Sequence, residues 1–391
     1  MKKYILIWAN SFFTKMSLFY APIEFLFYQS RGLSIFQVGL LFSFSSIVTI
    51  VTDLPFGLLA DKKSKKLSAT IGLVSAIIGT VGLIFSQSFL QFAFATMFLA
   101  IGDAGTSGSV EILLMNELEE ENQYYNISAY AGHWANLIGG VTIGTLYALW
   151  EVLPFILSVM FLLISLSIVI QVKELSKSND STIEKVVIES KKKEGLKQKW
   201  LAYFKNNSYI LFLLFLSYLL VPQLSVYLPV YLEFIELNVS LFGFVYMVAS
   251  LISILGTRFY KKYLNNTDSF RLILFSYFIL FLSTLVMSYT GNPYMGLLSY
   301  FVTRFVYGWF WIIFRVHIND HSTEEDKATI FGVREFVMNS AFFISDPLMS
   351  YIITSADIQY NYFVTSILLL VIILIMISVN GVKIIQQKLN Y

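Results

Sequence analysis

Long apolar runs separated by short charged or turn-rich segments extend over almost the whole chain. Each run has about 20 residues or more, the length at which a helix crosses a hydrocarbon core of ~30 Å. The runs are continuous rather than alternating, so they predict helices and not the strands of a barrel. The twelve predicted spans are 4–28, 34–60, 67–86, 89–115, 126–149, 152–172, 207–232, 240–260, 270–289, 293–317, 328–354 and 358–380.

One long polar segment divides these spans into two groups of six. Residues 174–206 are rich in Lys, Ser and Glu and follow the sixth span. This composition is typical of a linker, although the lysines and Trp200 would also suit a surface of anionic lipid headgroups. The predicted organisation is an N-terminal six-helix bundle (1–173), a cytoplasmic linker (174–206), a C-terminal six-helix bundle (207–380) and a cytoplasmic tail (381–391).

The two predicted halves resemble each other. An acidic segment begins at Asn116 after the fourth span, and another begins at Asn319 after the tenth. The second and eighth spans both begin at a serine, Ser34 and Ser240. A repeat near half the chain length is typical of transporters whose halves move about a central site.

The distribution of positive charge predicts the orientation. Of the 27 Lys and Arg residues, 23 lie at the termini, in the linker or in alternate loops, and the opposite side has only Arg31. Cytoplasmic loops carry an excess of Lys and Arg, so both termini are expected in the cytoplasm. The other three, Lys15, Arg304 and Arg334, lie inside predicted spans.

Composition narrows the class further. The chain is 57% hydrophobic and 13% charged, with a mean hydropathy of +0.69, whereas soluble domains carry about 25% charged residues. It has no Cys and three His, so thiol chemistry is excluded and a metal centre is not expected, even though His317 and His321 are four residues apart. No phosphate-binding, dinucleotide-binding or nucleophile-elbow motif is present, so no enzyme activity, cofactor or nucleic-acid partner is predicted.

The most specific motif follows the second span. Residues 53–66 read DLPFGLLADKKSKK, which resembles the GxLADxxGRK signature of the major facilitator superfamily. Gly57 would permit close helix approach, and Asp61 would face a neighbouring helix N-terminus. Ser64 stands where the family usually has Gly.

Other stretches resemble one bacterial subgroup of that superfamily over nearly the whole chain. They are Arg31 to Leu40 ("GLS…GL"), Ser107 to Asn116 ("SGSxE") and Asn319 with Lys327-Ala328-Thr329 ("N…RAT", with Lys for Arg). The resemblance implies a twelve-helix all-α membrane protein of two pseudo-symmetric bundles, in a cell membrane, with a cavity lined by helices 1, 4, 7 and 10. Gly132 to Gly144 resembles a degenerate antiporter motif, or else a packing face of small residues.

Three charges lie near the middle of predicted spans: Lys15, Asp103 and Arg304. A charge at that depth costs at least ~2.5 to 3.5 kcal/mol on insertion scales, so it requires a partner or a water-filled cavity. We predict that the three residues form the substrate site, with Asp103 binding a proton. The alternative is a salt bridge that only fixes helix packing.

A second group is predicted to form a cytoplasmic gate, as such groups do in the superfamily. Glu111 is expected to pair with Arg315, and Asp53 with Arg334; snorkelling without function is the alternative. The predicted gate residues are Asp53, Gly57, Asp61, Glu111, Arg315 and Arg334.

Some further residues are candidates for lining the cavity. Glu24 lies next to Pro22 near the outer end of the first span, and Asp346 precedes Pro347 in the eleventh. The aromatic candidates would contact an amphipathic solute, or else face lipid or pack in the core. The main candidates are Glu24, Trp134, Tyr218 and Trp309, and Tyr227 and Trp311 are further aromatic residues of this kind.

Secondary active transport is therefore the predicted function. Proton-coupled efflux of an amphipathic compound or peptide is favoured, mainly by the subgroup resemblance. Uptake by symport remains an alternative, as does a receptor or lipid enzyme on the same fold. The expected partners are the solute, a proton and membrane lipid, and the chain is expected to be a monomer.

Overall fold

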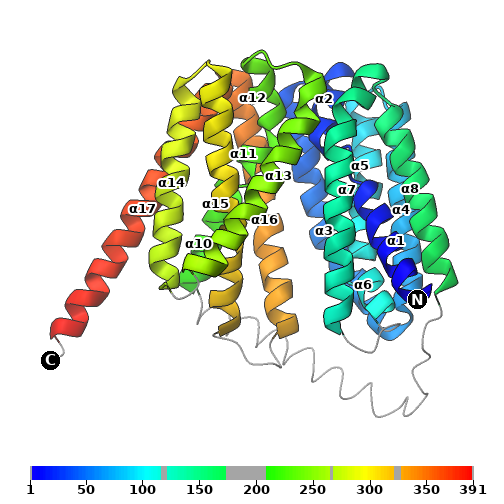
Figure 1. The fold of residues 1–391 in the computed structure, drawn as a ribbon, viewed down its shortest axis with the longest axis horizontal. Coiled ribbons are helices and arrows are strands. Elements are labelled where there is room, and N and C mark those ends of the chain that lie inside the picture. The colour runs from blue at the N-terminus through cyan, green and yellow to red at the C-terminus, as the bar shows by residue number, and fades with distance from the viewer. Residues whose placement is uncertain (1, 116–120, 173–207, 265–266, 321–326, 390–391) are drawn as a thin grey trace, which may run out of the picture.

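The computed structural model describes residues 2–115, 121–172, 208–264, 267–320 and 327–389, and the part of the chain that it describes is helical (Figure 1). The N-terminal half contains α1 (Lys2–Met16), α2 (Ala21–Ser30), α3 (Ile35–Lys62), α4 (Lys65–Phe85), α5 (Phe89–Thr106), α6 (Ser109–Met115), α7 (Glu121–Leu149) and α8 (Leu153–Gln171). The C-terminal half contains α10 (Ser208–Leu220), α11 (Gln223–Val226), α12 (Leu228–Phe234), η1 (Val239–Leu241), α13 (Phe242–Phe259), η2 (Tyr260–Leu264), α14 (Ser269–Tyr289), α15 (Pro293–Asp320), α16 (Lys327–Ser355) and α17 (Ile358–Leu389).

These helices confirm the predicted all-α membrane fold. Ten of the predicted spans coincide with described helical segments that are long and apolar enough to cross a membrane. The remaining two positions hold the interrupted pair α1 and α2, and α7, which has 29 residues. The predicted linker at 174–206 lies outside the described residues.

The first helix of each half is interrupted. A turn at residues 17–20 separates α1 from α2, and Pro22 lies in the first turn of α2. In the second half a turn at residues 221–222 ends α10, and Pro222 precedes α11. Proline lacks an N–H and clashes with the preceding helical turn, which explains why both helices break at corresponding points.

Two pairs of helices join the halves. The helix α3 packs against α16, and α7 packs against α13. The N-terminal end of α1, the C-terminal end of α17 and the helix ends that flank residues 173–207 all lie toward the bottom of Figure 1, and we call this the linker end. The bundles meet at the opposite end, which we call the closed end, and the ribbons of α3 and α16 diverge toward the linker end (Figure 1).

Glycine allows the helices to approach at the closed end. A Cβ on Gly39 of α3 would lie 2.6 Å from the carbonyl oxygen of Asp346 in α16. On α7, a Cβ at Gly140 would lie 2.6 Å from Cβ of Met247 in α13. These separations are too short for any side chain, so the backbones of the two halves pack directly against each other.

Polar and aromatic contacts complete this interface. The hydroxyl of Ser43 donates to the carbonyl of Phe343 over 2.8 Å, and the rings of Phe36 and Tyr351 meet edge to face with centroids 6.1 Å apart. All four residues lie in the closed-end halves of α3 and α16. The structure is therefore closed at this end of the bundle.

Candidate functional site

A cavity of about 260 Å³ lies among the helices of the N-terminal half. The carboxyl groups of Glu24 and Asp103 line it, together with the phenol of Tyr20. Among its described lining residues there is no Lys, Arg or His. We call it the acidic cavity. Its other hydroxyl-bearing lining residues are Thr14, Ser17, Ser45, Thr80, Thr96 and Thr106.

Helix breaks place the two carboxyl groups. Glu24 lies in the first turn of α2, just after the break in the first helix, where the helix N-terminus favours negative charge. Its Oε1 accepts a hydrogen bond of 2.6 Å from the hydroxyl of Tyr28, one turn later. Asp103 lies just before the break between α5 and α6, where Gly108 adopts a φ of +67°. That left-handed conformation favours glycine, so the sequence determines where this break falls.

A series of carboxyl groups leads from the acidic cavity toward the linker end. The charges of Glu24 and Asp103 interact. Asp103 interacts in turn with Asp53 of α3, and Asp53 interacts with Glu335 of α16. Within the described part of the chain, no ion pair joins Glu24, Asp103 or Asp53 to a basic residue. The field around these three carboxyl groups is therefore negative, whereas the charge of Glu335 is paired with Arg334.

The three mid-depth charges predicted to form one site occupy different surroundings. Asp103 lines the acidic cavity, whereas Lys15 is exposed on α1 and is not among the residues that line it. Arg304 lies in the other half: its Nη1 donates to the hydroxyl of Ser225 over 3.1 Å, and its guanidinium lies 4.8 Å from the ring centroid of Tyr307. The structure brings Asp103 close to Glu24 and forms no ion pair among the three predicted residues, all of which it describes.

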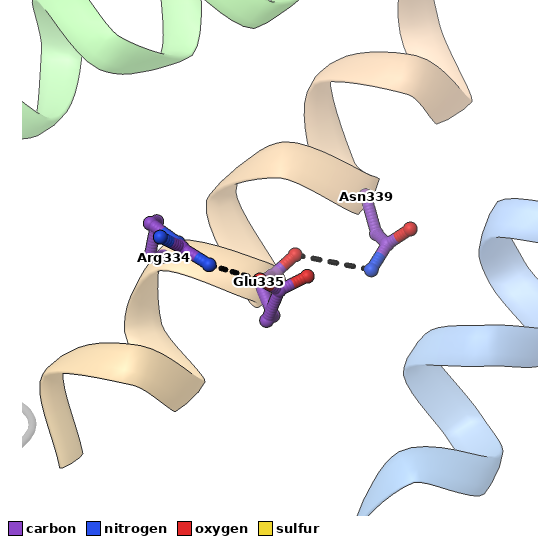
Figure 2. A network of polar contacts seen from close by, with 3 residues as sticks. All are labelled: Arg334, Glu335 and Asn339. Atoms are coloured by element: carbon purple, nitrogen blue, oxygen red, sulfur yellow. Dashed lines mark hydrogen bonds and ion pairs between the residues drawn. The ribbon is translucent and has the colours of Figure 1, made fainter. Parts of the chain in front are cut away.

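The predicted gate pair of Asp53 and Arg334 is not formed in this conformation. Arg334 Nη2 lies 2.8 Å from Glu335 Oε1, the carboxylate of the next residue (Figure 2). Asn339 donates over 3.1 Å to the main-chain oxygen of Glu335, one turn further along α16 (Figure 2). The ion pair that the structure shows for Arg334 is therefore with an adjacent carboxylate on the same helix.

The structure describes the surroundings of only some of the other predicted gate residues. Glu111 is half-buried in the first turn of α6, and Gly57 lies near the linker end of α3 with open space around it. The side chains of Asp61 and Arg315 lie outside the described residues, so the predicted pair of Glu111 and Arg315 stays a prediction.

A second cavity, of about 380 Å³, lies in the C-terminal half. The rings of Tyr218 and Trp311 both line it and stack on each other, with centroids 4.6 Å apart and planes 15° apart. Tyr307 meets Trp311 edge to face at 6.2 Å. We call it the aromatic cavity, and its lining residues are Leu214, Tyr218, Pro222, Tyr307, Trp311, Phe314 and Arg334.

Two other predicted aromatic residues lie elsewhere. Trp309 is only 1% exposed, and its Nε1 donates over 2.8 Å to the hydroxyl of Ser276, so it packs in the core of its half. Trp134 is 55% exposed on α7 and lines neither cavity. Sequence reasoning missed Tyr307 and Phe314 as lining residues, although their spacing from Trp311 places all three on one face of α15.

The buried carboxyl of Asp346 belongs to the closed-end interface. Gln223 Nε2 donates to Asp346 Oδ1 over 2.7 Å, and the hydroxyl of Tyr227 donates to the main-chain oxygen of Asp346 over 2.9 Å. Tyr227 also meets Phe25 of α2 edge to face at 5.6 Å. These contacts hold α11, α16 and α2 together, so Tyr227 and Asp346 help to fix the closed end.

Solved structures of transporters share this architecture. A nucleoside transporter, NupG, superposes with a TM-score of 0.82 at 11% identity, covering 97% of this chain and 99% of that one. A POT family transporter in complex with 5-aminolevulinic acid gives 0.76 at 13% identity, covering 96% of each chain. A bacterial homologue of the human lysosomal transporter Spinster, inward-facing and occupied, gives 0.71 at 12% identity, covering 97% of this chain and 96% of that one.

The sequence itself identifies the family. No curated protein matches it significantly. The family model of the Major Facilitator Superfamily matches residues 4–345, which includes both halves and the motif at 53–66. With this match and the shared twelve-helix architecture, the chain belongs to the Major Facilitator Superfamily.

Proposed function

We propose that this protein is a secondary active transporter that moves an amphipathic small solute or peptide by alternating access, driven by a proton gradient in the direction of export. The observation that carries the proposal is the closed end combined with unpaired carboxyl groups at membrane depth. Contact between the halves at one end fits a carrier that exposes its site to one side at a time. The structural neighbours are themselves named as transporters.

Asp103 is the proposed proton site. It faces the cavity, interacts with Glu24 and Asp53, and has no ion pair within the described residues. A carboxylate in such surroundings is costly to keep charged, so proton binding is coupled to whatever else occupies the cavity. Either direction of transport is compatible with this coupling. Export is proposed because of the subgroup resemblance, and uptake by symport is the alternative.

The aromatic cavity supports an amphipathic solute. The stacked pair of Tyr218 and Trp311 offers a flat apolar surface, and Arg334 adds a cation at its border. The proposed setting is a cell membrane, with the linker end in the cytoplasm and the chain acting as a monomer. A receptor or lipid enzyme on the same fold would not require a gradient-dependent carboxyl group.

The test is transport in proteoliposomes with an imposed pH gradient. Purified protein is reconstituted, candidate cationic amphipaths are loaded on either side, and movement is followed with the gradient in both directions. We expect accumulation against the solute gradient only with the pH gradient. Asp103→Asn should lose this dependence while solute exchange persists in part, because the amide resembles the protonated acid. Gradient-driven transport by Asp103→Asn equal to that of the parent would refute the proton role.

A further inference from the structure

We propose that the acidic cavity binds the positively charged ammonium group of the transported solute between Glu24 and Asp103. This inference rests on the proposed function and adds the chemical class of the substrate. It begins from the two carboxyl groups, which line one cavity and interact electrically. The described basic residues of the membrane region lie elsewhere, with Lys15 exposed on α1 and Arg304 held by Ser225 in the other half.

Three of the hydroxyl groups around the cavity donate their protons to main-chain carbonyls. Thr80 donates its proton to the carbonyl of Ala76 over 2.8 Å, and Thr106 donates to the carbonyl of Gly102 over 2.9 Å. Ser17 donates to the carbonyl of Thr14 over 2.8 Å in the same way. Because each hydroxyl carries one proton, the atoms that remain available to a ligand are oxygen lone pairs.

One lining hydroxyl, that of Thr96, forms no well-aligned hydrogen bond. Thr96 is only 5% exposed, and its Oγ1 forms no hydrogen bond in the described structure. It lies close to the hydroxyl of Tyr28, without good hydrogen-bond geometry. Tyr28 donates its own proton to Glu24, so the hydroxyl groups of Tyr28 and Thr96 form the buried surroundings of that carboxyl group.

An ammonium group matches this lining better than any anion or neutral sugar. It supplies N–H donors, or a charged methyl surface, to a wall that offers carboxylates, lone pairs and the ring of Tyr20. A cation in the cavity also offsets the mutual repulsion of Glu24 and Asp103. The volume of about 260 Å³ suits a charged head group rather than a whole drug-sized molecule, for which pockets of about 300–1,000 Å³ are usual.

The carboxyl groups outside the cavity support the same class of solute. Asp53 extends the negative field from the cavity toward the linker end as far as Glu335, whose charge is paired with Arg334. Such a field raises the local concentration of cations and excludes anions. A cationic head group would therefore be attracted along this path into the cavity.

The natural absence of Cys allows a direct test. Ser45 lines the cavity, so Ser45→Cys introduces a single thiol there with minimal change in shape. Its reaction rate is measured with two methanethiosulfonates, one bearing trimethylammonium and one bearing sulfonate, in purified protein. We expect the ratio of cationic to anionic rates to exceed that of a free thiol by at least about tenfold.

Neutral substitutions identify the source of that preference. Glu24→Gln and Asp103→Asn should each lower the rate ratio several-fold, while Asp103→Glu should retain it. Glu233→Gln is the matched control, because that carboxyl is exposed on α12 in the other half. Each variant is checked for a monodisperse elution profile, and Asp103→Glu provides a folded comparison if a neutral variant is unstable.

Three results would overturn the inference: a ratio no higher than that of a free thiol, a ratio unaffected by Glu24→Gln and Asp103→Asn, or no reaction with either reagent. The labelling does not depend on transport. A flat ratio in a protein that transports a solute in proteoliposomes would refute the cation site alone. A high ratio in a protein that moves no solute would refute the transport proposal alone.

Discussion

A single methyl group at the closed end should shift this protein toward its opposite conformation. Gly39 of α3 lies against α16, and a Cβ there would lie 2.6 Å from the main-chain oxygen of Asp346, with Ser350 closer still. A main-chain oxygen inside a helix cannot move aside as a flexible side chain can. Gly39→Ala is therefore incompatible with the present approach of the two halves.

The size of the effect follows from overpacking. Inserting a methyl group into a tightly packed contact costs about 1–3 kcal/mol. The gain in helix propensity from Gly to Ala, about 1 kcal/mol, is common to both conformations and cancels between them. The steric term applies only where α3 meets α16, so the ratio of closed-end to opened conformations should fall by about 5- to 150-fold.

The assay measures the separation of the other pair of helices. Thr145→Cys on α7 and Leu241→Cys in η1 place two spin labels on exposed positions beside the contact between Gly144 and Ser240. If the halves move as rigid bodies, Gly39→Ala should lengthen the distance between labels that it does not touch. Gly291→Ala is the control, because a Cβ there meets nothing within 4 Å. An unchanged distance distribution in folded Gly39→Ala would refute rigid-body opening.

Three further outcomes are expected. Gly57→Val should leave the present conformation undisturbed, since Gly57 has open space around it. If the linker ends of the two halves approach each other in the opposite conformation, the added side chain should disfavour that conformation. The same spin labels would then report a larger population closed at the closed end. Asp61→Asn should slow transport in proteoliposomes without loss of folded protein, and an unchanged rate would exclude a role for that carboxyl in the conformational balance. Trp309→Ala should destabilise the fold by about 3–5 kcal/mol because the indole is buried and hydrogen-bonded to Ser276. A lower thermal midpoint in detergent would show this loss of stability. Solute affinity retained in Trp309→Phe would show that Trp309 acts in packing and not in solute binding.

The membrane architecture was predictable because hydrophobicity acts over whole segments. Each apolar run is long enough to cross a bilayer by itself, so its position does not depend on which helix packs beside it. The interruptions were harder to predict. Pro22 and Pro222 both lie where a helix breaks, but Pro55 and Pro347 lie inside unbroken helices. Proline alone therefore does not decide between a break and a bend in a membrane helix, because neighbouring groups can satisfy the freed carbonyl.

The site was less predictable because the depth of a residue in the membrane does not specify which side of its helix faces a cavity. Lys15 and Asp103 lie at similar depths, yet Asp103 lines the acidic cavity and Lys15 does not. Arg304 could be expected to pair with a carboxylate, but it contacts a serine hydroxyl and a tyrosine ring instead. Which side of a helix faces a cavity depends on packing with helices distant in sequence, and this information is absent from the spacing of charges along one helix.

The interrupted helices explain why the two cavities lie where they do. Ser17 and Tyr20, in the break between α1 and α2, line the acidic cavity, and Pro222, in the break before α11, lines the aromatic cavity. Non-helical backbone at membrane depth is tolerated where it is buried in protein or lines a cavity. Tyr307 illustrates this, since its hydroxyl donates to the carbonyl of Val221 in the second break, which also accepts from the N–H of Leu224.

An interrupted helix thus borders a cavity in each half, but the linings differ: carboxyl and hydroxyl groups line one cavity, and stacked rings line the other. Each cavity belongs to a single half, so rigid movement of the halves changes the separation of the cavities without changing either lining. A solute with a cationic head and an apolar body could occupy both only at one separation. Its binding would then favour one conformation over the other, and this difference in affinity is what a carrier requires for its solute to drive a conformational change.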